Sequence, residues 1–140
     1  MAEYDEEGGE APRARVPRRE EGRQKTILAV DDAAFFLNML KMYMLGTGHK
    51  LICVNSGDAA LQYLATHSAD LFILDIEMPG MDGYELARKI REKEEKAHII
   101  FLTGNAKREN VYKAIKVGAS DFITKPITQA QVLARIAKFI

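Results

Sequence analysis

Short apolar runs alternate along the chain with segments in which apolar residues recur at helical spacing. The apolar runs are residues 26–30, 51–54, 71–74, 98–102 and 121–124. Runs of this length, bounded by polar or turn-forming residues, are typical of strands that are buried on both faces. The predicted helices lie at about 33–45, after Ser56, after the loop at 78–83, at about 107–117 and after Thr128. Five strands that each precede a helix predict an α/β protein, with one parallel sheet covered by helices on both faces.

Capping residues indicate where several of these helices begin. Asp32 and Ser56 have side chains that can accept hydrogen bonds from the first turns of the helices after them. Thr128 and Gln131 have the spacing of a capping box at the start of the last helix. In the third helix, apolar residues are predicted to face the sheet, and the basic residues, among them Arg91, are predicted to point outward.

Charge separates the first 25 residues from the rest of the chain. Residues 1–10 contain acidic residues and no basic ones, residues 11–25 are mainly basic, and thirteen of these 25 residues are charged. Such a segment buries too little apolar surface to offset the entropy of ordering it. We therefore predict a disordered charged tail at 1–25 and one folded domain at 26–140. An alternative is that the basic half binds an acidic partner or an acidic pocket of this protein.

Composition narrows the class of protein. The 140 residues contain 20 Lys or Arg and 20 Asp or Glu, so the formal net charge is zero. This balance argues against direct binding of nucleic acid or of a membrane surface through net positive charge. No apolar run approaches the roughly 18 residues that a membrane-spanning helix needs. Cys53 is the one cysteine, which excludes an intrachain disulfide and multi-cysteine zinc sites and makes a reducing cytoplasm the expected location.

Candidate chemistry gathers where the predicted strands end. Asp31 and Asp32 follow the first strand, Asp75 follows the third, Thr103 the fourth, and Lys125 lies just beyond the fifth. The carboxyl ends of parallel strands form one edge, where ligands bind. Carboxylates that repel one another there are tolerated around a hard cation, and oxygen ligands suit Mg²⁺. Asp75 can then act as a nucleophile that forms an aspartyl phosphate, with Thr103 and Lys125 contacting the phosphoryl group.

Four motifs carry a resemblance to a known family. They are ILAVDD at 27–32, LDIEMPGMDG at 74–83, LTG at 102–104 and GASDFITKP at 118–126. In these segments the chain resembles the receiver domains of two-component response regulators, and the resemblance covers residues 26–140. It implies a doubly wound, flavodoxin-like (βα)5 fold with a five-stranded parallel sheet in the strand order 2-1-3-4-5.

The resemblance also implies a role for individual residues. It implies Asp75 as the phosphoacceptor, Lys125 as the lysine that pairs with the phosphoryl group, and a cis peptide bond before Pro126. The implied Mg²⁺ ligands are Asp31, Asp32, Asp75 and the backbone carbonyl of Glu77. Thr103 and Phe122 would form the switch pair. Because Phe122 lacks the hydroxyl of a tyrosine, such a switch would work by packing alone.

The function expected from this resemblance is that of a stand-alone response regulator. It would accept a phosphoryl group on Asp75 from a sensor histidine kinase or a histidine phosphotransfer protein. It would then bind an unidentified downstream protein or pass the phosphoryl group on in a phosphorelay, as a monomer or a weak, phosphorylation-dependent homodimer. The only chemistry expected of the chain itself is Mg²⁺-dependent self-phosphorylation and autodephosphorylation, so it would not be an enzyme.

Three other interpretations are weighed against this one. A phosphatase with an aspartate nucleophile needs a second aspartate two residues later, where this chain has Glu77. A flavodoxin-like cofactor carrier needs a phosphate-binding loop after the first strand, and that loop is missing. A receiver domain cut from a longer protein is compatible with every motif.

The first predicted helix is apolar on nearly all sides. Phe35, Met42 and Leu45 flank a narrow polar strip formed by Asn38 and Lys41. A helix of this kind is normally covered on both sides. One interpretation is that the three apolar residues form a partner surface, and the other is that they belong to the core or are scattered surface residues.

Overall fold

The computed structural model describes residues 24–94, 96–105 and 107–140. Strands and helices alternate through this part of the chain. They are β1 (Thr26–Val30), α1 (Ala34–Tyr43), β2 (Lys50–Val54), α2 (Gly57–Leu64), β3 (Leu71–Asp75), α3 (Gly83–Lys93), β4 (His98–Thr103), α4 (Arg108–Lys116), β5 (Asp121–Thr124) and α5 (Gln129–Ala137). All five predicted strands and all five predicted helices are therefore present.

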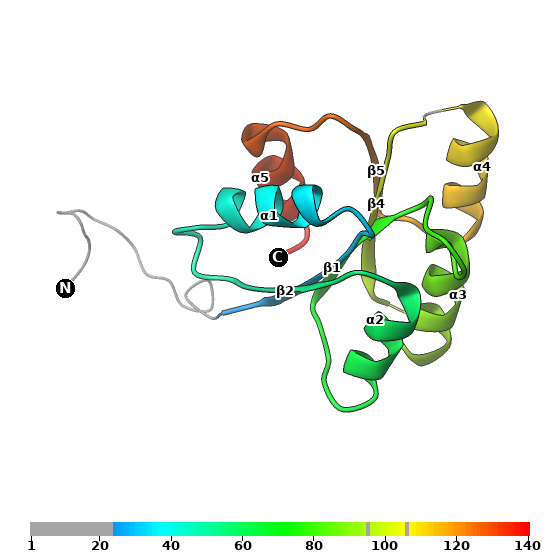
Figure 1. Ribbon diagram of the computed structural model, residues 1–140, viewed down its shortest axis with the longest axis horizontal. Coiled ribbons are helices and arrows are strands. Elements are labelled where there is room, and N and C mark those ends of the chain that lie inside the picture. The colour runs from blue at the N-terminus through cyan, green and yellow to red at the C-terminus, as the bar shows by residue number, and fades with distance from the viewer. Residues whose placement is uncertain (1–23, 95, 106) are drawn as a thin grey trace, which may run out of the picture.

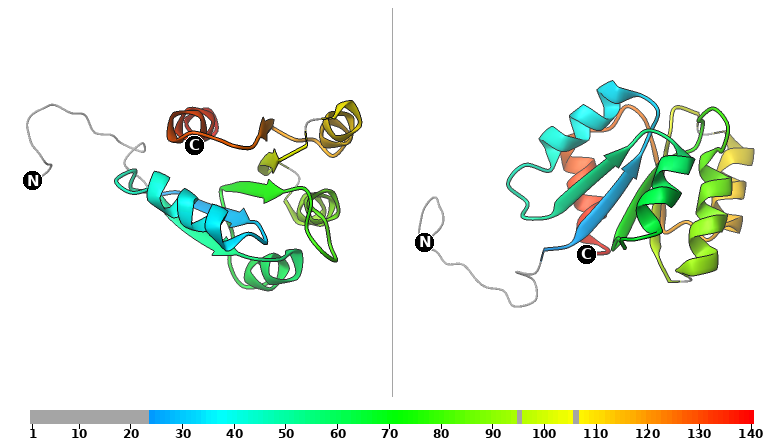
Figure 2. Two further views of the ribbon diagram at one scale, coloured as in Figure 1. Left: turned by 45° about the horizontal axis from the view of Figure 1, so that its top comes forward. Right: turned by 60° about the horizontal axis from the view of Figure 1, so that its bottom comes forward.

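The strands form one parallel sheet in the order β2-β1-β3-β4-β5. Helices α1 and α5 cover one face, and α2, α3 and α4 cover the other (Figures 1 and 2). This arrangement confirms the doubly wound fold and the strand order that the family resemblance implied. The order reverses between β1 and β3, so the carboxyl ends of these two strands flank the switch point at which ligands bind in such sheets.

Successive side chains of a strand point to opposite faces of the sheet, so the strands contribute to the core on both sides. In β1, Ile27 and Ala29 pack against α1 and α5, whereas Leu28 and Val30 pack on the opposite side. All five residues of β3 are buried, because neighbouring strands flank it and helices cover both of its faces. The central strand is thus anchored along its whole length, and its last residue is Asp75.

The capping predictions are confirmed at two helices and wrong at one. Ser56 accepts a hydrogen bond from the N–H of Ala59, and Thr128 and Gln131 form the capping box. Asp32 does not cap α1, because the N-cap residue is Ala33 and no side chain caps this helix. The N–H of Ala33 donates instead to Asp31 Oδ1 at 2.9 Å, and the carboxylate of Asp32 belongs to the acidic cluster described below.

The prediction that Arg91 points outward from α3 is also wrong. Its guanidinium group donates hydrogen bonds to the backbone carbonyls of Ala97, Val117 and Gly118. Burial lowers the pKa of this guanidinium group. A long side chain that presents several donors in a fixed plane can join segments in this way, although the charge alone predicts a solvent-exposed position.

The predicted charged tail lies outside the described residues up to position 23. At the start of the described part, the carbonyl of Lys25 accepts a hydrogen bond of 2.8 Å from the N–H of Lys50. Lys25 is therefore joined to the sheet just ahead of β1. Among the helices of the described residues, none combines the length and the apolar character needed to cross a membrane.

Candidate functional site

The candidate site lies at the carboxyl edge of the sheet. In the described part of the chain, the buried polar or charged residues are Asp31, Asp75 and Thr103, which are 2%, 5% and 0% exposed. Asp31 directly follows β1, Asp75 ends β3 and Thr103 ends β4. Polar groups are costly to bury, so their concentration at one edge marks this edge as the functional part of the molecule.

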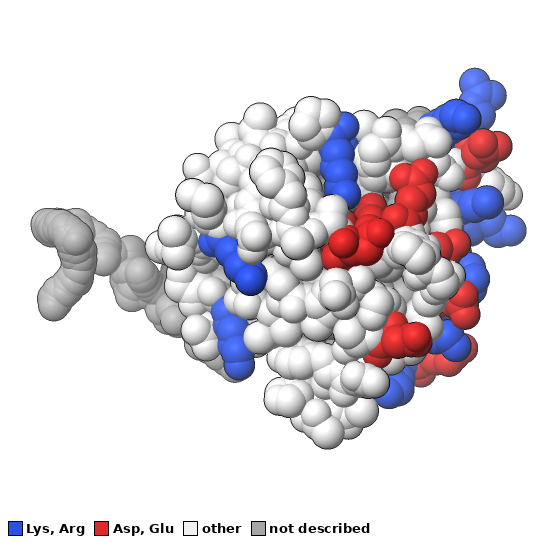
Figure 3. All heavy atoms as spheres, in the orientation of Figure 1, with Lys and Arg blue, Asp and Glu red and all other residues white. Residues whose placement is uncertain are grey.

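Three carboxylates form a tight cluster at this edge. Asp31, Asp32 and Asp75 each contribute an oxygen atom, and these oxygens lie within 4.8 Å of one another. Asp32 is exposed, so the cluster is open to solvent on one side. Figure 3 shows acidic side chains gathered near the middle of the molecular face, where β1 ends in Figure 1. Oxygen ligands with one open side fit Mg²⁺, which uses few protein ligands and keeps several waters.

Burial and charge repulsion both raise the pKa of Asp75. Burial, followed by the charge of Asp31, raises the pKa of Asp75 to about 6, while Lys125 lowers it. Ionisation of Asp75 near neutral pH therefore costs free energy, and a bound cation would reduce this cost.

Lys125 supplies the positive charge at this edge. Its Nζ atom lies 2.7 Å from Asp31 Oδ2 and 3.5 Å from Asp75 Oδ1. On another side, the same atom lies 4.3 Å from the centre of the Phe36 ring. The peptide bond between Lys125 and Pro126 is cis. The ammonium group is thus placed against two carboxylates and an aromatic ring.

The hydroxyl of Thr103 lies in a different set of hydrogen bonds. It accepts from the N–H of Asn105 at 3.0 Å and is 3.4 Å from Glu77 Oε1. The sequence predicted a role for the backbone carbonyl of Glu77, and its carboxylate near Thr103 was not anticipated. The spacing of Glu77 from Asp75 was the available signal, but it does not determine which way an exposed side chain turns.

Phe122 is the second residue of β5. It is half-buried in the part of the core that faces α2, α3 and α4. It pairs in register with Phe101 of β4, two positions before the pair of Thr103 and Thr124. The structure therefore places Thr103 and Phe122 on adjacent strands.

A close approach of two backbone segments explains the glycine that begins α3. A Cβ atom at Gly83 would lie 2.3 Å from the carbonyl oxygen of Asp75. No side chain fits in this space, so glycine at this position allows the start of α3 to pack against the end of β3.

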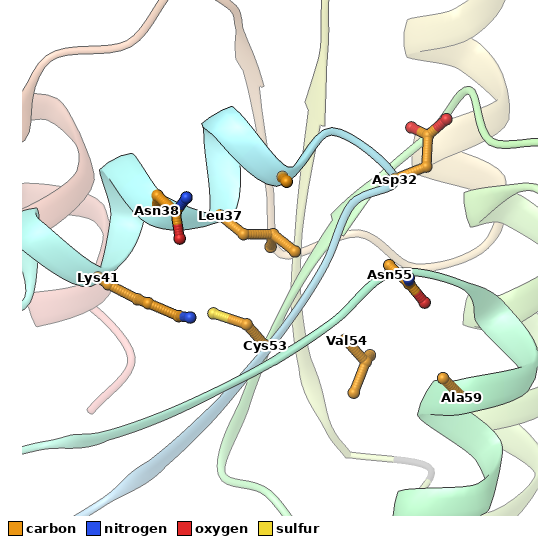
Figure 4. A pocket seen from close by; sticks show the side chains of 9 residues that line it. Asp32, Leu37, Asn38, Lys41, Cys53, Val54, Asn55 and Ala59 are labelled. Carbon is orange, nitrogen blue, oxygen red and sulfur yellow. The ribbon is translucent and has the colours of Figure 1, made fainter.

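An open groove of about 470 Å³ adjoins the acidic cluster. Its lining residues are Asp32, Ala34, Leu37, Asn38, Lys41, Cys53, Val54, Asn55 and Ala59. Figure 4 shows the side chains of Lys41 and Cys53 pointing toward each other between α1 and β2, with Asp32 at the other end. Burial raises the pKa of the Cys53 thiol although Lys41 opposes the shift, so the thiol is protonated at neutral pH.

Large apolar side chains are exposed on two helices. Phe35, Met42 and Leu45, on and just after α1, are 80%, 68% and 76% exposed. Tyr112 and Ile115 on α4 are 60% and 69% exposed. The interpretation that the three residues near α1 belong to the core is therefore wrong. The apolar pair on α4 was not anticipated from the sequence.

Comparison with known proteins identifies the family. The family model described as "Response regulator receiver domain" matches residues 27–137. The chain belongs to this family. Receiver domains act as phosphoacceptors, which agrees with the kind of site that the family resemblance implied.

Individual relatives support this assignment. The receiver domain is 37% identical over 113 residues to the chemotaxis protein CheY of Bacillus subtilis, a match that covers 80% of this chain and 94% of CheY. It is 33% identical over 112 residues to the response regulator GtcR of Aneurinibacillus migulanus, covering 80% of this chain and 46% of GtcR. The chain thus spans about half the length of several of the curated relatives it matches.

A solved structure extends the likeness to the fold. A CheY-like response regulator receiver domain protein from Methanospirillum hungatei superposes with a TM-score of 0.79 at 28% identity. The match covers 83% of this chain and 93% of that one.

Proposed function

We propose that this receiver domain accepts a phosphoryl group on Asp75 from the phosphohistidine of a sensor histidine kinase or a histidine phosphotransfer protein. The observation that carries the proposal is the buried Asp75 carboxylate, which ends the central strand beside Asp31, Asp32 and Lys125. The phosphotransfer partners are supported by similarity to receiver segments of histidine kinases, such as the sensor histidine kinase GacS of Pseudomonas protegens.

Asp75 is the nucleophile in the proposed step. One of its oxygens attacks phosphorus, the new P–O bond forms as the P–N bond to the histidine breaks, and the imidazole leaves and takes up a proton. Lys125 contacts Asp31 and Asp75, and its charge is placed to balance that of the incoming phosphoryl oxygens. Mg²⁺ would be held by Asp31, Asp32, Asp75 and the backbone carbonyl of Glu77, and it supplies positive charge that lets two anions approach.

The direct test is incubation of the protein with acetyl phosphate and Mg²⁺. We expect the mass of the intact protein to increase by one phosphoryl group per chain. A chelator should prevent the increase, because the acetyl phosphate anion and three carboxylates repel one another without the cation. Labelling of equal extent with and without the chelator would contradict the metal-dependent step.

We further propose that Thr103 and Phe122 transmit the phosphorylated state. Thr103 Oγ1 is 3.4 Å from the Glu77 carboxylate and within hydrogen-bonding distance of Asn105. A phosphoryl oxygen on Asp75 would compete for this hydroxyl, and movement of Thr103 would open space for the Phe122 ring. Because Phe122 is half-buried against the α3–α4 side of the core, its repacking would alter the surface that α4 and β5 present.

Replacement of Thr103 by Ala is expected to uncouple phosphorylation from partner binding. The Thr103→Ala protein should still be labelled at Asp75, because the nucleophile and Lys125 are intact. It should lose most of the difference in affinity for a partner that distinguishes the two states, measured by titration with and without acetyl phosphate. Thr103→Ser keeps the hydroxyl and should keep that difference. Equal discrimination by the Ala variant and the wild type would exclude this switch.

The exposed apolar side chains near α1 are proposed as the docking surface for the phosphodonor. Phe35 lies in the first turn of α1, close in sequence to Asp31 and Asp32, and the surface continues through Met42 to Leu45. The left side of the face in Figure 3 carries few charged side chains, so an apolar partner would meet little desolvation cost there. Burial of such a side chain contributes about 1.5–3 kcal/mol before association costs.

Replacement of Phe35, Met42 and Leu45 together by Ser or Gln tests this surface. We expect at least tenfold slower phosphotransfer from the protein donor, since roughly 1.4 kcal/mol of lost binding already gives that factor. The melting temperature and labelling by acetyl phosphate should change little, because the three side chains are exposed. The matched control changes Tyr112 and Ile115, two large apolar side chains that are 60% and 69% exposed on α4, and should leave transfer normal. A steep fall in melting temperature with normal transfer per folded molecule would contradict docking.

We propose that the output is a phosphorylation-dependent interaction with another protein or onward transfer of the phosphoryl group. A stand-alone role is supported by the match to 94% of CheY, and the longer regulators that match show the alternative architecture.

A further inference from the structure

The ammonium group of Lys125 contacts an aromatic ring as well as two carboxylates. Its Nζ atom lies 4.3 Å from the centre of the Phe36 ring, 2.7 Å from Asp31 Oδ2 and 3.5 Å from Asp75 Oδ1. Phe36 is 6% exposed and lies in the first part of α1. The ring therefore supports the ammonium group from the α1 side and is itself fixed by the core.

An aromatic ring in this place restricts the positions that the Lys125 ammonium group can take. The face of an aromatic ring attracts a cation, and the attraction is strongest where water is excluded. A lysine side chain is flexible and loses much rotamer freedom when it is fixed in one position. If the ring already holds Nζ in place before the reaction, less side-chain entropy is lost when the lysine contacts the phosphoryl group.

A second contact ties α1 to the segment that follows Lys125. The hydroxyl of Tyr43 donates to the carbonyl of Ile127 at 3.2 Å, and Gln129 Nε2 donates to the carbonyl of Tyr43 at 3.2 Å. Tyr43 is seven residues after Phe36, two helical turns along the same face. Helix α1 thus holds the backbone of this segment at one end and the tip of Lys125 at the other.

We infer that Phe36 is a positioning residue for phosphoryl transfer: its ring holds the Lys125 ammonium group where the phosphoryl oxygens enter. The inference rests on the proposed function of Asp75. It also links that site to the docking surface, because Phe35, the residue before Phe36 on α1, is 80% exposed. A partner that binds Phe35 contacts the same helical turn that positions Lys125.

Graded fluorination of the ring tests the inference. Phenylalanines with one, two and three ring fluorines at position 36 weaken the attraction for a cation stepwise and change the shape of the side chain little. We expect the logarithm of the rate of Asp75 labelling by acetyl phosphate and Mg²⁺ to fall in steps, to roughly tenfold below wild type with three fluorines. The labelling rate of Phe36→Leu should be similarly low. Phe36→Tyr keeps an aromatic face, so it should keep most of the wild-type rate.

Two controls separate charge attraction from packing. Trifluorophenylalanine at Phe72, which is 0% exposed in β3, should leave the rate unchanged. In a Lys125→Gln background the series at position 36 should be flat, because no cation faces the ring. A flat series in the wild-type background, with Asp75 still labelled, would overturn the role of Phe36 and leave the proposed function standing. If Asp75 of the wild type is not labelled at all, the proposed function fails and the role of Phe36 fails with it.

Discussion

The Asp75→Asn variant is expected to gain no phosphoryl group from acetyl phosphate and Mg²⁺ under conditions that label the wild type fully. Asparagine has nearly the same shape as aspartate, so the buried end of β3 should keep its structure. Its amide lacks the negative oxygen that attacks phosphorus and contributes no charge to a metal site. The mass of the intact protein gives the extent of labelling, and lability to hydroxylamine identifies an acyl phosphate.

A surface aspartate provides the matched control for this experiment. Asp58 lies in the first turn of α2 and is exposed, outside the cluster of Asp31, Asp32 and Asp75. Asp58→Asn removes the same charge and should be labelled like the wild type. If Asp75→Asn acquires an acid-labile phosphoryl group to the wild-type extent, another residue is the acceptor and the site assignment is wrong.

The fold could be predicted because each of its signals is local. A buried strand such as β3 is a continuous apolar run, and the helices after it begin at recognisable caps such as Ser56 and Thr128. Repeated βα units leave few topologies, since crossovers between parallel strands are right-handed. The strand order came from the family resemblance, because periodicity along the chain does not determine which strands are neighbours.

The site was predictable only as far as the ends of strands determine it. Backbone topology brings Asp31, Asp75 and Thr103 to one edge whatever their side chains do. The orientation of the carboxylate of Glu77 and the position of the ring of Phe36 depend on side-chain packing between segments distant in sequence. Nothing in the spacing of Phe36 along the first helix indicates a contact with a lysine 89 residues later along the chain.

Two errors have the same physical origin. Asp32 was predicted to cap α1, and Arg91 was predicted to face solvent, because aspartate before a helix and arginine on a polar face usually do so. In the folded domain, Asp32 lies with two other carboxylates. Arg91 contacts carbonyls around Gly118. Both side chains take part in contacts between segments, which outweigh the local preference.

Asp75 should also make the fold less stable at neutral pH when Mg²⁺ is absent. Burial and the charge of Asp31 raise its pKa from 3.8 to about 6, so the folded protein holds this proton more tightly than the unfolded chain. The resulting stabilisation is complete below about pH 4 and is lost as the pH rises through about 6. A rise in the pKa of Asp75 from 3.8 to about 6 corresponds to roughly 3 kcal/mol of unfolding free energy. We therefore expect the free energy of unfolding of Asp75→Asn to exceed that of the wild type by about 2–3 kcal/mol above pH 7.

Urea denaturation of both proteins in the presence of a chelator measures this difference. The two proteins share every other titratable group, so the difference between their unfolding free energies reports Asp75 together with its coupling to Asp31 and Lys125. This difference should be small near pH 4 and reach its full value above pH 7. Mg²⁺ added at neutral pH should stabilise the wild type more than Asp75→Asn, because an ion that binds only the folded state stabilises it by RT ln(1 + [Mg²⁺]/Kd), which is larger for the protein that binds the ion more tightly. A difference that is the same at low and neutral pH would show that the ionised carboxylate is accommodated without strain, and that the cation is not needed to relieve it.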